Sequence, residues 1–312
     1  MEIADVKKHM RGPLAPVLTV FRQGSLQVDL DAIQENVDQQ IRRGMTKGAA
    51  ILLAAGAGGD FPLLTLEERK AIIKAVADAA GGRATVLGCA QCTLNTEAVA
   101  LAEWSQKVGC YGIQLSPTWY YPPNETQIYD LFKAVATSID ICVMVYHTPW
   151  LDSHMSIELL SRLWTDFSTI RSIKWSTFSE RETMEGYIEL AGKYAIIDNG
   201  AAVPHAALLG ATGFVTHLAN VWPEHDVDLW ARFAAGDYAG ATAEFVAVNW
   251  AWRKLRGWAS QTIAGGESLL VKPAAEMTGF HGGPSRPPMV TLNGAQRAHV
   301  REVLQQIGAP LI

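Results

Sequence analysis

The chain has 312 residues, 49% of them hydrophobic and 18% charged, so it can bury the core of one large domain or of two medium ones. Its net charge of −5 has both signs interspersed, which argues against nucleic acid as a main partner. The first residues lack an apolar signal core, and no stretch approaches the roughly 18 apolar residues that span a bilayer. We therefore expect a soluble cytoplasmic protein that binds neither nucleic acid nor membrane.

Segments of strand character alternate with segments of helical periodicity. Apolar, partly β-branched runs predict eight strands, at residues 14–21, 49–54, 84–88, 111–116, 141–146, 170–175, 195–198 and 213–216. Helices are predicted between them at residues 29–43, from residue 65, and at 95–107, 127–137, 157–164 and 180–194. Thr65 with Glu68 has the spacing of a capping box, which supports the start of the second helix.

This alternation predicts a parallel sheet, and eight strand–helix units predict its closure into a (β/α)8 TIM barrel of the α/β class. An open doubly wound sheet is the rival, but no Gly-x-Gly-x-x-Gly motif follows the first strand. Only helices are predicted later, one or two over 229–256, then 268–277 and 293–306. We expect a catalytic barrel over residues 1–223, completed and extended by helices over 224–312.

Two reactive side chains stand at the ends of neighbouring predicted strands. Tyr146 ends the fifth strand, and Lys174 follows 28 residues later near the end of the sixth. A barrel of about 250 residues has roughly 31 residues per unit, so both are expected at the carboxyl ends of adjacent strands, where such barrels keep their chemistry. A lysine amine attacks a carbonyl only after losing its proton, and partial burial favours that loss. Tyr146 would then move protons.

A glycine-rich loop follows the second predicted strand, with Gly56, Gly58 and Gly59 within four positions. Glycines let the backbone approach a ligand and aim N–H groups at a carboxylate or phosphate. A tight turn without a ligand is the alternative, which glycine content alone favours. The expected position on the same rim as Tyr146 and Lys174 favours an anion site. The three elements together suit a 2-oxo acid.

The four cysteines include Cys89 and Cys92, which have the spacing of a redox or half-metal motif. No second such pair and no paired histidines accompany them, so free thiols are the favoured interpretation. We predict neither a metal nor another cofactor.

Taken in order, these motifs resemble the dihydrodipicolinate synthase and N-acetylneuraminate lyase family of lysine-dependent aldolases over nearly the whole chain. The glycine loop of that family resembles residues 56–60, its Tyr-Asn-x-Pro strand end resembles residues 146–149, and its Schiff-base lysine matches Lys174. Its Tyr-Tyr-x-x-Pro segment fits less well and points to Tyr120 or to Trp119, depending on the proline used as anchor. A Gly-Gly-Pro segment at 282–288 completes the match.

The resemblance implies a (β/α)8 barrel with a C-terminal helical extension, assembled as a homo-oligomer (tetramer or dimer). Lys174 would form the imine, Tyr146 and Tyr120 would be catalytic, and the backbone amides of residues 57–59 would hold the substrate carboxylate. Further predicted substrate contacts are Thr216, Asn220, Trp119 and Trp175.

Two departures from the family pattern change the expected chemistry. Ala57 and Gly58 stand where the family has two hydroxyl residues, one of which links two tyrosines in a proton relay. That relay must be absent or rebuilt through a water, His147 or Thr148. Leu151 stands where dihydrodipicolinate synthases carry an arginine for the second substrate's carboxylate, so we do not expect that activity.

Tryptophans form a third departure, because Trp119, Trp150 and Trp175 all flank predicted rim residues. Their apolar faces would suit an aromatic or otherwise bulky aldehyde. Packing of loops or of subunit contacts is an equal alternative.

Three other polar residues are interpreted as structural. Strand alternation would point His147 away from the barrel interior. His217 is expected to hydrogen-bond within its loop, and Asp60 to accept from backbone donors at the start of a helix.

The leading hypothesis is a class I lyase: Lys174 forms an imine with a 2-oxo acid such as pyruvate, and a carbon–carbon bond to an aldehyde is then made or broken. The alternative is a 2-keto-3-deoxy sugar acid dehydratase using the same imine, which the few polar residues at the predicted rim disfavour. The alternative of another class is a barrel that binds a carbonyl metabolite without turnover. The presence of both Lys174 and Tyr146 argues against it.

Overall fold

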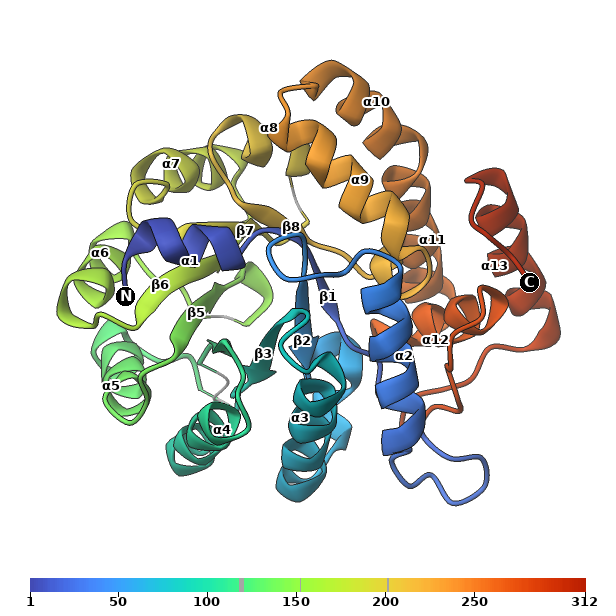
Figure 1. Ribbon diagram of the computed structural model, residues 1–312, viewed down its shortest axis with the longest axis horizontal. Helices are drawn as coiled ribbons and strands as arrows, with labels where there is room; N and C mark the ends of the chain where they lie inside the picture. Colours follow the sequence, from blue (N-terminus) through green and yellow to red (C-terminus); the bar gives the residue numbers. More distant parts are fainter. Residues whose placement is uncertain (118–120, 152, 201) are drawn as a thin grey trace.

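A computed structural model describes residues 1–117, 121–151, 153–200 and 202–312. Its eight parallel strands close into a barrel in chain order, with helices around it (Figure 1). The predicted (β/α)8 barrel is thereby confirmed. The strands are β1 (Gly12–Pro16), β2 (Ile51–Ala54), β3 (Thr85–Cys89), β4 (Gly112–Leu115), β5 (Cys142–His147), β6 (Ile170–Trp175), β7 (Ala195–Asp198) and β8 (Gly213–Val215).

The outer helices follow their strands in the expected order. They are α2 (Leu30–Arg42), α3 (Leu66–Ala80), α4 (Asn95–Lys107), α5 (Glu125–Ala136), α6 (Ile157–Asp166), α7 (Glu180–Leu190), α8 (Val203–Leu208) and α9 (Pro223–Ala234). The capping box predicted at Thr65 and Glu68 is present at the start of α3. The short α8 has no predicted counterpart.

The first strand lies earlier than predicted, because it ends at Pro16 and not at Phe21. The apolar run beyond it is buried for another reason. Leu18 packs in the hydrophobic cluster of the C-terminal helices, and Phe21 forms an isolated antiparallel bridge with Val28. Apolar character at these positions therefore reflects burial under the C-terminal extension and not membership of the sheet.

Strand alternation divides the core into two layers. On β5, Cys142 and Met144 belong to the cluster inside the barrel, whereas Val143 and Val145 pack outwards against the helices. The N-terminal helix α1 (Ile3–His9) supplies Val6 to the inner cluster and fills the amino-terminal end of the barrel. The chemistry of the barrel is therefore confined to the carboxyl ends of the strands.

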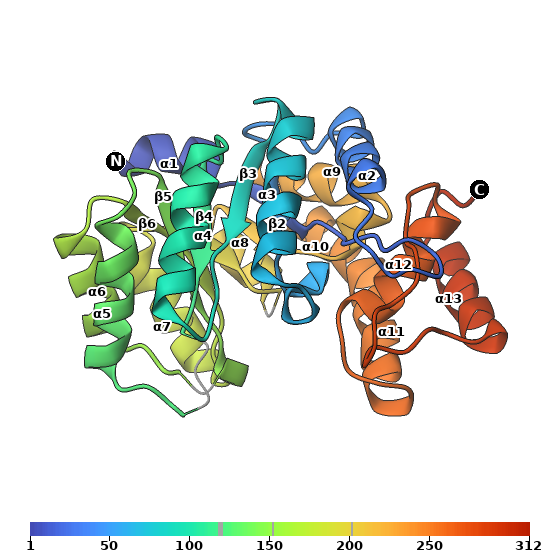
Figure 2. The same ribbon diagram turned by 90° about the horizontal axis from the view of Figure 1, so that it is seen from below.

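The C-terminal helices form a second packing unit at one side of the barrel, opposite α5 and α6 (Figure 2). They are α11 (Asn249–Thr262), α12 (Ser268–Met277) and α13 (Gly294–Gln306), whereas α10 (Tyr238–Ala247) buries Ala241 and Phe245 in the outer core of the barrel. Three helices, α9 to α11, cover the region where one or two were predicted. The first break falls at Gly236, after which Asp237 caps α10 by accepting from the amide of Gly240.

Candidate active site

Lys174 and Tyr146 are partners in the register of β5 and β6 at the carboxyl end of the barrel. The Lys174 Nζ lies 4.0 Å from the centroid of the Tyr146 ring. Only 6% of Lys174 and 5% of Tyr146 are exposed. Alternation places both on the inner face, since their neighbours Ile173, Val145 and Trp175 pack in the outer layer. The two side chains predicted to act together are therefore in contact.

The amine of Lys174 makes no hydrogen bond or ion pair with any residue in the described ranges. Partial desolvation without a fixed carboxylate partner is the environment in which a lysine becomes a nucleophile. Its positive charge lowers the pKa of His217 and the pKa of Glu267 across the mouth. The lysine thus faces the β8 side of the barrel.

The glycine loop forms a short 3-10 turn, Ala57–Gly59, directly after β2. The amide of Gly59 is engaged within the turn, donating to the carbonyl of Gly56 at 3.0 Å. No hydrogen bond within the described part of the chain uses the amides of Ala57 and Gly58. Two neighbouring free amides are suited to a carboxylate. Gly59, predicted as a third donor, is not available.

The ring of His217 fills the space beside Gly58. A β-carbon added at position 58 would lie 3.1 Å from both Nε2 and Cδ2 of His217 and 2.9 Å from the Cβ of Pro16. A hydroxyl side chain at this position, as in the family pattern, would collide with that ring. The absence of a side chain at position 58 therefore leaves the space that the buried ring of His217 fills.

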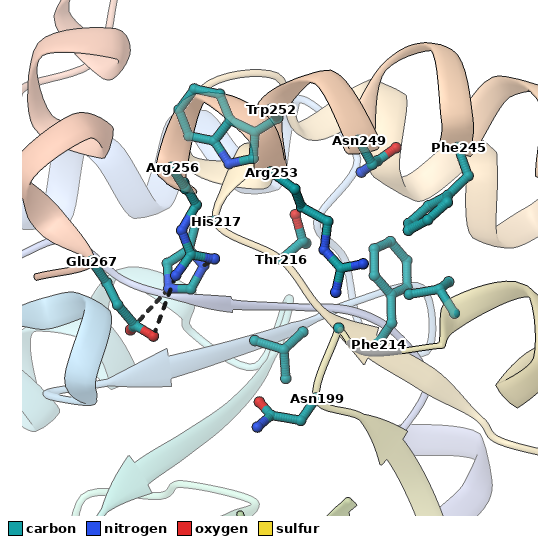
Figure 3. Close-up of a pocket in the computed structure, with 13 residues that line it drawn as sticks. Asn199, Phe214, Thr216, His217, Phe245, Asn249, Trp252, Arg253, Arg256 and Glu267 are labelled. Carbon is teal, nitrogen blue, oxygen red and sulfur yellow. Dashed lines mark hydrogen bonds and ion pairs between the residues drawn. The ribbon is translucent and has the colours of Figure 1, made fainter. Parts of the chain in front are cut away.

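His217 belongs to a buried charge cluster and not only to its own loop. Its Nε2 lies 2.9 Å from Oε2 of Glu267, and the Nη1 of Arg256 lies 3.2 Å from its Nδ1 (Figure 3). Because the arginine can only donate, Nδ1 accepts and the ring is neutral. Burial lowers the pKa of His217, in agreement with this tautomer. Burial alone would raise the pKa of Glu267, but His217, Arg256 and Lys174 together hold it below its ordinary value.

Thr216 and Asn220, predicted to bind substrate, support the mouth from behind. The Thr216 hydroxyl donates to Oδ2 of the buried Asp226 at 2.6 Å. The Asn220 amide donates to the carbonyl of Pro16 at 3.0 Å, and its oxygen accepts from Gln40. Their polar groups are engaged within the protein, and Thr216 also lines a cavity between α11 (Asn249–Thr262) and the end of β8.

Trp175 also lies outside the mouth, which corrects its predicted role. Alternation turns it away from Lys174, and its indole packs against Gly186 of α7 while its Nε1 donates to the carbonyl of Thr183 at 3.1 Å. His147 stacks on the same indole, with ring centroids 4.5 Å apart, as the outward orientation predicted for it requires. Trp119 and Tyr120 lie outside the described residues.

Of the groups considered for a rebuilt relay, His147 is therefore turned away. Its Nδ1 donates to the carbonyl of Ser176 at 2.9 Å, and burial lowers its pKa to about 4. Thr148 is buried, and its hydroxyl has no hydrogen-bond partner among the described residues. Thr148 thus stays available as a relay group.

Asp60 does not accept from backbone donors as predicted. It ends the glycine loop with φ of 58°, and its Oδ2 lies 2.9 Å from Nζ of Lys272 on α12. Both side chains are buried, and the hydroxyl of Ser268 donates to the other carboxylate oxygen. This ion pair fastens the glycine loop to the C-terminal extension.

Sequence reasoning missed a polar wall inside the barrel near β3 and β4. Gln114 donates to Oε1 of Gln91 at 2.6 Å, and Gln91 donates to the hydroxyl of Ser116 at 2.6 Å. Isolated glutamines carry no motif, so only the closed barrel identifies them.

Within the described ranges, no three or more His, Cys, Asp or Glu side chains are arranged to hold a metal ion. All four cysteines are buried and none of these described residues forms a disulfide, in line with the interpretation of Cys89 and Cys92. None of the described helices has the length and apolarity needed to cross a membrane.

Barrel topology and a mouth lysine in contact with a tyrosine place the chain among (β/α)8-barrel enzymes. Residues 9–307 match the model of the Dihydrodipicolinate synthetase family, and the chain belongs to that family of lyases.

The relatives span nearly the full chain. An uncharacterized DapA-like lyase from Halobacterium salinarum is 29% identical over 306 residues, 96% of this chain and 94% of its own. A 4-hydroxy-tetrahydrodipicolinate synthase from Chlorobium phaeobacteroides is 27% identical, with 97% and 98% covered. Among solved structures, YagE from E. coli K12 in complex with pyruvate matches with a TM-score of 0.84 at 24% identity, covering 96% of this chain and 99% of that one. At this identity the structural match supports the fold.

Proposed function

We propose that the protein is a class I lyase that joins a 2-oxo acid to Lys174 as a Schiff base and makes or breaks a carbon–carbon bond to an aldehyde. The observation that carries the proposal is the buried Lys174 amine, 4.0 Å from the Tyr146 ring and without a fixed partner in the described residues. Family membership and the pyruvate bound by the similar YagE protein support it.

The chemistry follows from these groups. The neutral Lys174 amine adds to the keto carbon, water leaves, and the resulting imine draws electrons from the adjacent carbon. Tyr146 gives its phenol proton to the hydroxyl that leaves as water, and the resulting phenolate then takes a proton from the adjacent carbon, giving an enamine. As the enamine attacks the aldehyde carbon, Tyr146 returns that proton to the aldehyde oxygen, and water then hydrolyses the imine and frees the lysine. The amides of Ala57 and Gly58 would hold the carboxylate throughout. No step requires a metal, so activity should survive in a chelator.

The second substrate is proposed to be other than that of dihydrodipicolinate synthesis. Leu151 replaces the arginine that the family resemblance leads one to expect there. Trp175 no longer supports an aromatic aldehyde, because it packs outside the barrel. Homo-oligomeric assembly and a cytoplasmic location stay predictions.

Exchange of the C3 protons of pyruvate for solvent deuterium, followed by NMR, tests the proposal without knowledge of the aldehyde. The protein should catalyse exchange in the presence of a chelator, and Lys174→Met should abolish it. Exchange only with 2-keto-3-deoxy sugar acids would favour the dehydratase. Failure with a broad panel of 2-oxo acids would favour a binding protein.

A further inference from the structure

We propose that the aldehyde partner carries a carboxylate and that Arg253 binds it in a cavity beside the barrel mouth. This cavity, called here the arginine pocket, has a volume of about 90 Å³ and lies between α11 and the carboxyl ends of β7 and β8. Figure 3 shows Arg253 reaching from α11 into the pocket, towards Asn199 and Phe214. The inference rests on the proposed function, since it names the class of that lyase's second substrate.

Arg253 is a half-buried cation without an anionic partner. Its guanidinium makes no hydrogen bond or ion pair with any residue that the structure describes. It is held by aromatic contacts, with its central carbon 5.3 Å from the ring centroid of Trp250 and 5.9 Å from that of Phe245. Its Nη2 approaches Gly200, where an added β-carbon would lie 3.4 Å away. Arg253 lines the pocket, and none of its five N–H donors has an acceptor among the described residues.

The carboxylate that lines the arginine pocket is already neutralised. Glu267 lies 2.9 Å from His217 and 3.7 Å from Nη2 of Arg256. With His217 neutral, Arg256 balances Glu267, and the residues that line the pocket keep one net positive charge, that of Arg253. The buried Asp198, which does not line the pocket, acts on this charge only without a direct ion pair.

Asp198, behind the pocket, is not a direct ion-pair partner of Arg253. It is fully buried and accepts from the hydroxyl of Tyr187 and from the amide of Ala202. Its charge reaches Arg253 only at longer range. A half-buried guanidinium in this position is completed by an anion from outside the protein.

The arginine pocket lies beside the mouth that holds Lys174. Two of its lining residues, His217 and Glu267, feel the charge of the lysine. A third, Asn199, donates at 3.0 Å to the hydroxyl of Ser176, two residues beyond Lys174. A substrate held by its anionic end at Arg253 can therefore present its other end to the enamine on Lys174.

A carboxylate is the anion that fits this arrangement. The planar fork of an arginine binds a carboxylate through two parallel hydrogen bonds, and the cavity has room for a group of that size. Position 151 carries leucine in place of the arginine that the family resemblance leads one to expect there. Arg253 instead supplies one from the opposite side, next to β7 and β8, which would change the direction from which the aldehyde enters.

The test measures how two aldehydes of similar size, succinic semialdehyde and butanal, inhibit the deuterium exchange of pyruvate. Either reaction or simple binding in the mouth slows exchange, so turnover is not needed. In the native protein the semialdehyde should inhibit at a concentration at least tenfold below that of butanal. Arg253→Met should raise the inhibition constant of the semialdehyde about 10- to 100-fold and leave that of butanal unchanged.

Each inhibition constant is determined relative to the exchange rate of the same variant without aldehyde. Lys254→Met, at the exposed neighbouring position on α11, is the matched control and should leave exchange and both constants as in the native protein. Arg253→Lys keeps the positive charge but loses the planar guanidinium, so it should raise the inhibition constant of the semialdehyde by an intermediate factor. This variant replaces Arg253→Met in the test if the methionine variant does not fold.

Two results would overturn the inference while leaving the proposed function intact: normal exchange with no preference for the charged aldehyde, or a preference that survives in Arg253→Met. Inorganic phosphate inhibiting as strongly as the semialdehyde, in a manner dependent on Arg253, would overturn the carboxylate assignment. Absence of pyruvate exchange in the native protein would instead refute the proposed function, and the inference with it.

Discussion

The imidazole of His217 lies against the α-carbon of Gly58, so close that a β-carbon at position 58 would stand 3.1 Å from the ring. The same ring pairs with Glu267 and accepts from Arg256. The ring of His217 therefore excludes a side chain at position 58, and its two nitrogens contact the carboxylate of Glu267 and the guanidinium of Arg256.

Restoring a hydroxyl at position 58 should damage the protein unless His217 is removed. Gly58→Ser should lower pyruvate exchange about tenfold or more, because crowding below 3.4 Å must be relieved by movement of His217 or Pro16. Gly58→Ser with His217→Ala should retain more activity than the product of the two single effects, a coupling measured by a double-mutant cycle. Ala57→Ser, at an exposed neighbouring position, is the control. Additive single effects would show that the two residues do not interact.

Tyr146→Phe should separate imine formation from proton transfer. The phenyl ring keeps the surface over which the Lys174 amine lies, while the hydroxyl is lost. Exchange should fall about 10²- to 10⁴-fold, the usual contribution of a general acid or base, while a reducible adduct still forms over a longer time. Kinetics of exchange and of adduct formation, measured side by side, check this. Unchanged exchange would remove Tyr146 from the mechanism.

The buried Asp60–Lys272 pair should behave as a unit. Lys272→Met leaves an uncompensated buried carboxylate and should cost about 3–5 kcal/mol of stability. The double variant with Asp60→Asn should recover part of that loss, because no buried charge is left unpaired. Thermal unfolding of the native protein and of the two variants provides the measurement. A double variant less stable than Lys272→Met would contradict the buried-charge explanation.

Stability should fall in mild acid in part because of His147. Burial lowers its folded pKa from 6.5 to about 4, so the folded chain keeps it neutral while the unfolded chain takes up a proton below pH 6.5. The stabilisation is present above pH 6.5 and is lost as pH falls towards 4, by up to about 3 kcal/mol.

His147→Asn should therefore show a shallower loss of unfolding free energy between pH 6.5 and 4 than the native chain. Denaturant titrations at several pH values compare the two slopes, with pH 8 as the reference at which both residues are uncharged. Parallel slopes would mean that His147 is protonated in the fold as readily as in the unfolded chain.

The sequence predicted the barrel and its central pair because both depend on local patterns. Apolar alternation marks the strands, and a spacing of 28 residues places Tyr146 and Lys174 at equivalent ends of adjacent units. The apolar run after Pro16 led to a wrong strand end, since Val17 and Val20 are buried in the outer core of the barrel and Leu18 against the C-terminal helices without belonging to the sheet.

Contacts between distant segments could not be predicted in the same way. Asp60 and Lys272 are 212 residues apart, and Arg253 lines the pocket at β7 and β8 only because α11 packs beside these strands. Thr216 and Asn220 were predicted from their place after β8, but their hydroxyl and amide groups bond to Asp226 and Pro16. The position of a residue along the chain can predict that it lies near the mouth. It does not predict the direction in which its polar group points.

Borohydride reduction in the presence of pyruvate, followed by peptide mass spectrometry, measures covalent chemistry at Lys174. We expect a single reduced adduct on the peptide that contains Lys174, absent from Lys174→Met and formed equally in a chelator. Unmodified Lys174, or an adduct on the other buried lysine, Lys272, would contradict this expectation.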